Sequence, residues 1–209
     1  MDYVLGDAEV RVLGSLIEKE ITTPDYYPLS LNALVAACCQ SSNRNPVTHF
    51  DEETVARAVD TLREKKLVHV VDRGESRVSK YRHVLYEAMN LSRPAIAVMC
   101  VLMLRGPQTV GEIRTRTNRL YDFSSLEEVE TTLNALISTG TPLVARIPRQ
   151  TGQKEVRYAH LLSICVLRVS AVGPMPQYSM LLPKCGVESP SKPDSQGFRA
   201  STPPYRQTG

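Results

Sequence analysis

Tryptophan is absent from this sequence, and aromatic residues make up only 6% of its 209 residues, so aliphatic side chains must fill its core. No apolar run is long enough to span a bilayer, since the longest covers residues 95–104. The first residues also lack the basic region of a secretory signal. We therefore expect a cytoplasmic protein that does not contact a membrane.

Cysteines are few, and their spacing does not suit a disulfide framework or a metal site. There are five, an odd number, and none belongs to a Cys-x-x-Cys pair. Cys38 and Cys39 are adjacent in an apolar helical pattern, where neighbouring side chains point about 100° apart. They could not easily share a tetrahedral metal ion with His49, so buried cysteines in a reducing compartment are the better interpretation.

Motifs for catalysis are missing as well. The sequence contains no glycine-rich phosphate loop, nucleophile elbow, dinucleotide fingerprint or paired acid–base set. We therefore expect a protein that is not an enzyme and that has no catalytic residues, no cofactor and no metal ion.

The formal net charge is +3, and residues 164–209 account for all of it. That region has five basic and two acidic residues, which leaves 20 of each sign among residues 1–163. It also holds seven of the fourteen prolines and no sustained apolar period, so we expect a Pro-rich disordered tail. Any nucleic-acid site must come from local patches of positive charge.

One pattern of apolar residues occurs twice in the remaining sequence. Helical spacing and hairpin signals predict helices at 8–20, 30–39 and 51–66, followed by strands at 67–71 and 77–84. Ser30 and Asp51 are suitable N-caps for the second and third of these helices. The second half is expected to contain helices at 94–105 and 110–119, a third starting after Ser124 or Ser125, and strands at 143–148 and 154–160.

The two halves correspond in detail. Val55, Val59 and Leu62 match Val129, Leu133 and Leu136 at a constant offset of 74 residues. Three helices followed by a β-hairpin are typical of a winged helix. The predicted fold is mostly α with short β-hairpins, in two tandem winged-helix (helix-turn-helix plus wing) domains at 1–88 and 89–163. The helix at 95–104 is apolar all round, so we expect the two units to pack against each other.

Several runs of residues are unusual enough to suggest a family. They are ITTP at 21–24, YPLSLNALV at 27–35, ACCQSSNRNPV at 37–47, LRGPQT at 104–109, GEIR at 111–114 and RYAHL at 157–161. Through these runs the sequence resembles the YceH-like family of bacterial proteins, over about residues 3–163. The resemblance implies a tandem winged-helix fold and leaves the function open.

The sequence departs from the family's pattern in two places. Cys39 and Ser41 stand where members carry Asn and Lys, which removes a basic contact expected near this helix end. From about Ile164 the chain becomes Pro-rich, where members often end in a charged, coiled-coil-like helix. The dimerisation that such a helix could support does not carry over, so a homodimer is an open alternative.

The predicted wings carry most of the candidate nucleic-acid contacts. These are Arg73, Arg77, Lys80 and Arg82 in the first wing and Arg149, Lys154 and Arg157 in the second. If Tyr81 and Tyr158 face inward, strand alternation places Lys80, Arg82 and Arg157 outward. Exposed cations on a hairpin suit phosphate contacts, which position a protein on DNA without reading its sequence. The alternative is a solvated basic strand edge that prevents unwanted pairing.

The third helix of each unit is a weaker candidate for reading bases. Its expected outward face holds Glu53, Arg57, Asp60 and Glu64 in the first unit and Glu127, Thr131 and Asn134 in the second. Carboxylates there would be repelled by phosphates, and Arg57 with Asn134 is too little for recognition in the major groove. The pattern counts against sequence-specific binding.

Other candidates have simpler explanations beside the functional one. Arg44, in the turn before the third helix, and three arginines of the second unit could contact a duplex backbone or an acidic partner. The three are Arg114, Arg116 and Arg119; the alternative is surface pairing with Glu112 and Asp122. His83 and His160 occupy equivalent places after Tyr81 and Tyr158, so we expect a structural role near the sheet ends.

The first hypothesis for function is a regulatory, DNA-associated protein that contacts the nucleic-acid backbone of double-stranded DNA through its basic wings. The alternative is a protein–protein adaptor that uses its winged helices to bind a partner protein. The acidic third helices and the zero net charge of residues 1–163 favour the adaptor, whereas the basic wings favour DNA.

Overall fold

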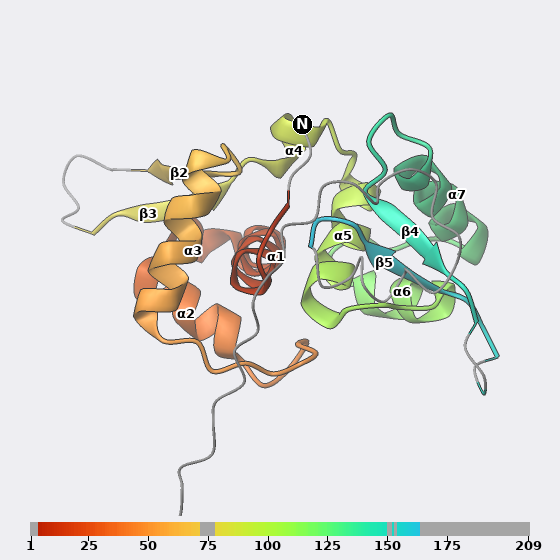
Figure 1. Ribbon diagram of the computed structural model, residues 1–209, viewed down its shortest axis with the longest axis horizontal. Coiled ribbons are helices and arrows are strands. Elements are labelled where there is room, and N and C mark those ends of the chain that lie inside the picture. Colours follow the sequence, from red (N-terminus) through yellow and green to blue (C-terminus); the bar gives the residue numbers. More distant parts are fainter. Residues whose placement is uncertain (1–3, 72–77, 150–151, 153, 164–209) are drawn as a thin grey trace, which may run out of the picture. The chain divides into compact units, whose positions relative to one another are not determined.

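A computed structural model describes residues 4–71, 78–149, 152 and 154–163. These residues are mostly helical, with small antiparallel sheets (Figure 1). The predicted tail at 164–209 and the wing residues Arg73 and Arg77 lie outside the described residues. Within the described ranges, no helix has the length and apolarity needed to cross a membrane.

Each half contains three main helices followed by a pair of antiparallel strands. The first half has α1 (Asp7–Thr22), a 3-10 helix (Pro24–Tyr26), β1 (Leu29–Ser30), α2 (Leu31–Cys39), α3 (Glu52–Glu64), β2 (Val68–Val71) and β3 (Lys80–His83). The second half has α4 (Leu85–Met89), α5 (Arg93–Arg105), α6 (Val110–Thr117), α7 (Leu126–Ile137), β4 (Val144–Ile147) and β5 (Arg157–His160). The predicted division into domains at 1–88 and 89–163 stays a prediction.

Local side-chain signals set the helix starts. The side chains of Ser30 and Asp51 accept hydrogen bonds from the backbone N–H groups of Ala33 and Thr54, as expected of N-caps. Thr109 caps α6 in a capping box with Glu112. Of the two serines considered for α7, Ser125 is the cap.

Two short elements were not expected. β1 pairs antiparallel with β3, with Leu29 opposite Tyr81, so the first sheet has three strands in the order β1-β3-β2. α4 lies in the segment between the two halves and ends at Asn90, which adopts a left-handed conformation (φ 48°). The second sheet contains β4 and β5, with Ala145 opposite Ala159.

The two halves share one hydrophobic core, as expected from the apolar helix at 95–104. α1 lies between the α2–α3 pair and α5 (Figure 1), and residues 95–104 of α5 are all buried. Gly14 of α1 lies where α5 approaches most closely. A Cβ atom at Gly14 would come within 2.9 Å of Leu104 Cδ2 and 3.0 Å of Leu104 Cγ. The absence of a side chain at Gly14 therefore permits this helix contact.

We expect Gly14→Ala to lower the free energy of unfolding by about 1–2 kcal/mol in urea denaturation, because overpacking costs more than the helix propensity of alanine returns. The matched control is Gly111→Ala in α6, where a Cβ would meet nothing within 4 Å. The control should be neutral or stabilising by up to about 1 kcal/mol. Equal effects of the two substitutions would contradict a tight contact between α1 and α5.

Candidate functional site

The described part of the first hairpin offers little exposed positive charge. Tyr81 of β3 packs against the core, as expected, and its neighbour Lys80 is half-exposed. Arg82 Nη1 lies 3.7 Å from Glu87 Oε1, so α4 supplies a partly compensating carboxylate. Lys80, in contrast, has no carboxylate within 4 Å among the described residues.

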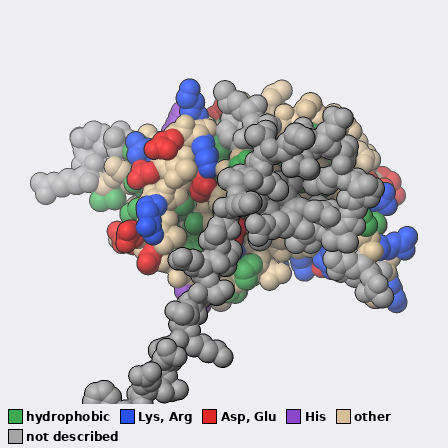
Figure 2. Space-filling model, in the orientation of Figure 1, with side chains coloured by type: hydrophobic (Ala, Val, Ile, Leu, Met, Phe, Trp, Pro, Cys, Tyr) green, Lys and Arg blue, Asp and Glu red, His purple; other side chains and the backbone are tan. Residues whose placement is uncertain are grey.

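The second hairpin is more strongly basic at its free end. Arg146 on β4, and Arg149 and Lys154 beyond the strand ends, are exposed, and none of the three forms an ion pair with a described residue. Arg149 Nη1 donates to the backbone oxygen of Lys154 at 3.3 Å, which links the two sides of the hairpin. Figure 2 shows basic side chains gathered at this end of the β4–β5 hairpin, at the lower right.

Arg157 differs from the outward, unpaired cation that strand alternation suggested. Its Nη1 donates to Glu112 Oε2 at 2.8 Å and to the backbone oxygen of Pro107 at 2.9 Å. The side chain is about one-third exposed, and Glu112 offsets its charge. Arg157 therefore fixes β5 to the start of α6, and a phosphate contact would have to compete with Glu112.

The third helices present mixed or acidic surfaces, as the sequence suggested. On α3, Arg57 is exposed and lies 3.6 Å from Glu53, and Arg63 lies 2.9 Å from Asp60. Figure 2 accordingly shows acidic and basic side chains interspersed over α3. On α7, Glu127, Glu130 and Asn134 are exposed. A hydrogen bond from Ser125 lowers the pKa of Glu127.

Arg44 is buried, which corrects its assignment as a nucleic-acid contact. Its side chain has no exposed surface, and Nη2 lies 2.7 Å from Glu18 Oε2 of α1. Nη2 and Nε donate to the backbone oxygen of Ala37 near the end of α2, at 2.8 and 3.2 Å. Nη1 donates to the backbone oxygen of Asn43 at 3.0 Å. The guanidinium joins α1, α2 and the following loop, and it is not available to a duplex.

We expect Arg44→Ala to destabilise the protein by about 3 kcal/mol or more, because it leaves the Glu18 carboxylate without its buried partner. Arg57→Ala removes an equal charge from an exposed pair and should cost less than about 0.5 kcal/mol. Urea denaturation monitored by circular dichroism measures both values. If Arg44→Ala were as mild as Arg57→Ala, the ion pair would not hold these elements together.

The two equivalent histidines are buried near the sheet ends, as expected of structural residues. The backbone N–H of Leu85 donates to His83 Nδ1 at 3.2 Å, so the ring hydrogen lies on Nε2, which faces Glu20 Oε2 at 2.7 Å. His160 Nδ1 has no hydrogen-bond partner among the described residues, and burial lowers the pKa of His160 to about 4. No group of three or more potential metal ligands occurs in the part of the chain that the structure describes.

The buried His160 should make the protein sensitive to acid. Its pKa is lower in the folded chain than in the unfolded chain, where it is about 6.5, so the unfolded state binds more protons between these values. Stability is therefore lost as the pH falls from about 6.5 towards about 4. We expect the loss between pH 7 and pH 4.5 to be about 2–3 kcal/mol smaller in His160→Leu than in the original chain.

Urea midpoints at the two pH values measure this difference. The control is His49→Leu, since His49 is exposed and its replacement should leave the pH dependence unchanged. Identical pH profiles for the original chain and His160→Leu would show that His160 does not titrate in this range.

Burial makes two of the described cysteines poor nucleophiles. Cys38 and Cys100 are buried, and burial raises the pKa of the Cys38 thiol to about 11 and that of Cys100 further still. The Cys39 thiol donates to the backbone oxygen of Phe50 at 3.4 Å. The Cys38 and Cys100 thiols remain protonated at neutral pH. The contacts of Cys38 and Cys39 agree with their interpretation as packing residues.

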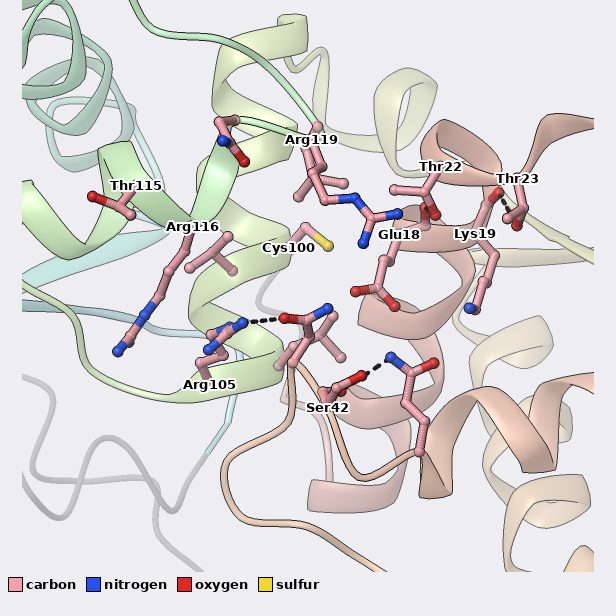
Figure 3. Close-up of a pocket in the computed structure, with 16 residues that line it drawn as sticks. Glu18, Lys19, Thr22, Thr23, Ser42, Cys100, Arg105, Thr115, Arg116 and Arg119 are labelled. Atoms are coloured by element: carbon pink, nitrogen blue, oxygen red, sulfur yellow. Dashed lines mark hydrogen bonds between the residues drawn. The ribbon is translucent and has the colours of Figure 1, made fainter.

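A pocket of about 450 Å³ lies where α1 and the loop at 40–43 meet α5 and α6. Its lining includes the basic residues Lys19, Arg105, Arg116 and Arg119 and a single carboxylate, Glu18. Figure 3 shows the Arg119 guanidinium extending into this space, from the segment that follows α6, towards Glu18 of α1. We call this site the basic pocket.

The basic pocket is not apparent from the sequence. Arg116 and Arg119 are predicted as possible contacts to a duplex backbone or an acidic partner, whereas no sequence pattern indicates a role for Lys19 or Arg105. Lys19 lies in the last turn of α1, and Arg105 lies in the last turn of α5. Cations are common at such helix ends, so neither residue stands out in the sequence. Arg114 does not line the pocket. Its side chain donates instead to the backbone oxygens of Phe123 and Ser124.

Known proteins share most of this sequence. A family model described as a protein of unknown function, DUF480, matches residues 5–153. A UPF0502 protein from Opitutus terrae is 54% identical over 175 residues, which are 83% of this chain and 76% of that protein. Two further UPF0502 proteins, from Pelobacter propionicus and Solibacter usitatus, are 57% and 59% identical, over 78% of this chain and 74% and 78% of theirs. These matches confirm the family resemblance inferred from the sequence runs.

Proposed function

We propose that this chain, which belongs to the DUF480 family of proteins of unknown function, is a DNA-associated, non-enzymatic protein built from two winged helices. The repeated order of three helices and an antiparallel strand pair supports the two winged helices. In this arrangement β2–β3 and β4–β5 are the wings, and α3 and α7 are the helices that enter a groove in sequence-reading relatives of the fold.

The observation that carries the proposal is the cluster of exposed cations at the free end of the β4–β5 hairpin. Arg146, Arg149 and Lys154 are all exposed, and they form no ion pair with a described residue. Arg82 and Arg157 would have to leave a carboxylate partner to contact a phosphate, whereas these three cations would not. Their phosphate contacts therefore have a lower electrostatic cost. The β4–β5 hairpin is therefore the main DNA contact in this proposal, and the β2–β3 hairpin contributes through Lys80.

The acidic third helices limit the kind of binding. Glu127 and Glu130 on α7, and Glu53 and Asp60 on α3, would face phosphates if either helix entered the major groove. Repulsion between these carboxylates and the phosphates opposes close approach. The protein would therefore hold the DNA backbone without a strong preference for sequence, and regulation would follow from where the protein is recruited.

A protein–protein adaptor is the second candidate, and the surface of α3 favours it. Acidic and basic side chains alternate there in the pairs Glu53–Arg57 and Asp60–Arg63 (Figure 2). Such a surface matches a partner protein of mixed charge better than a uniformly negative duplex. In that case the basic hairpin would bind an acidic segment of the partner.

We expect Arg149→Gln and Lys154→Gln to weaken binding to all duplex sequences alike. Each lost phosphate contact should flatten the plot of log K against log salt by roughly one unit, because fewer counterions are released. Fluorescence anisotropy with a labelled duplex at several salt concentrations measures the slope. Asn134→Ala should leave the preference between sequences unchanged.

Arg63→Gln is the control for a general loss of positive charge, since Arg63 is paired on α3. It should leave the slope as it is. A sharp sequence preference that disappears in Asn134→Ala would show that α7 reads bases. Undetectable binding at low salt would remove the DNA proposal, and the same hairpin variants would then test capture of an acidic partner protein.

A further inference from the structure

The basic pocket is built by both halves of the chain. Glu18 and Lys19 come from α1 and Asn43 from the loop after α2, while Arg105 and Arg119 come from the end of α5 and the end of the α6 region (Figure 3). A volume of about 450 Å³ falls within the range of small-molecule sites. None of its lining residues belongs to the β4–β5 hairpin, so the pocket is distinct from the surface proposed to contact DNA.

Positive charge dominates the inside of this pocket. Lys19, Arg105 and Arg119 have no carboxylate within 4 Å among the described residues. Glu18 is the one acidic residue in the lining, and its Oε2 already accepts from Arg44 at 2.7 Å. Arg116, also in the lining, is offset by Glu112 at 3.4 Å. Lys19, Arg105 and Arg119 thus share a concave site in which Glu18, already paired with Arg44, is the one carboxylate of the lining.

Contacts with the loop after α2 hold Arg105 in place. Arg105 Nη2 donates to the side-chain oxygen of Asn43, which adopts a left-handed conformation (φ 59°). The same loop is tied to α5, since the backbone N–H of Asn45 donates to the backbone oxygen of Leu104 at 2.9 Å. Burial lowers the pKa of Arg105 and the nearby Arg116 lowers it further, whereas Glu18 raises it. One guanidinium of the site is therefore positioned before any ligand arrives.

We propose that the basic pocket binds a small polyanion of the phosphate or pyrophosphate class, with one ligand per chain. Two arginines supply planar pairs of N–H donors, which match the oxygen atoms of a phosphate group. Lys19 adds a third charge from the opposite wall, so a ligand with two anionic groups contacts both halves at once. Gln40, Ser42 and Asn118 add uncharged polar groups to the lining, which suit the remaining part of such a metabolite.

Isothermal titration of the full chain with inorganic pyrophosphate tests this proposal. We expect saturable binding at one site per chain that weakens with added salt. Arg119→Gln and Lys19→Gln should each weaken the binding by about tenfold to a hundredfold, the usual effect of losing a charge-assisted hydrogen bond. Among the described residues, neither side chain forms a hydrogen bond or an ion pair. Circular dichroism checks that both variants remain folded.

Two controls separate this site from the proposed DNA surface. Arg63→Gln removes a paired cation from α3 and should leave pyrophosphate affinity unchanged. The double variant Arg149→Gln/Lys154→Gln alters the hairpin and should also leave pyrophosphate affinity unchanged, while it weakens duplex binding. Failure of the DNA proposal would therefore not affect this result.

Several outcomes would overturn the proposal. One is a dissociation constant for pyrophosphate weaker than about 1 mM at low salt, since binding of that strength needs no built site. Another is an equal affinity in the original chain and in both pocket variants. A third is competition in which a short duplex displaces pyrophosphate and loses affinity in Arg119→Gln, which would make the pocket part of a nucleic-acid surface.

Discussion

The buried ion pair between Arg44 and Glu18 is the contact on which the arrangement of the first half depends. Arg44 reaches α1 through Glu18 and the end of α2 through the backbone oxygen of Ala37. The loop that carries Arg44 then contacts α5 through Asn43 and Asn45. Arg11 strengthens the same connection, since its Nη2 donates to the backbone oxygen of Pro46 at 2.6 Å. One loop therefore fixes α1, α2 and α5 relative to one another.

The sequence predicted the main elements because their signals are local. Apolar periodicity located the long helices, and Ser30 and Asp51 marked two of their starts. β1 and α4 escaped prediction because two and five residues are too few to show a period. Their formation depends on tertiary partners, such as the pairing of Leu29 with Tyr81.

The candidate site was less predictable, since its properties arise between distant segments. Arg44 lies in a polar run and was expected at the surface, and its burial depends on Glu18, 26 residues earlier. Arg157 was expected to be an outward cation, yet Glu112, 45 residues earlier, pairs with it. The basic pocket gathers Lys19, Arg105 and Arg119 from three elements, and no spacing along the chain reveals such a group. Net charge is equally uninformative, because the first 163 residues hold as many acidic as basic residues.

The carboxylate of Glu112 contacts three groups. Its Oε2 accepts from the N-cap backbone of α6 at Thr109 and from Arg157 of β5, and its Oε1 lies 3.4 Å from Arg116 beside the basic pocket. The base of the β4–β5 hairpin and the rim of the pocket therefore share one negative charge. If a bound anion drew Arg116 away from Glu112, the Glu112 carboxylate would interact more strongly with Arg157. The basic pocket and the β4–β5 hairpin are therefore electrostatically linked through Glu112.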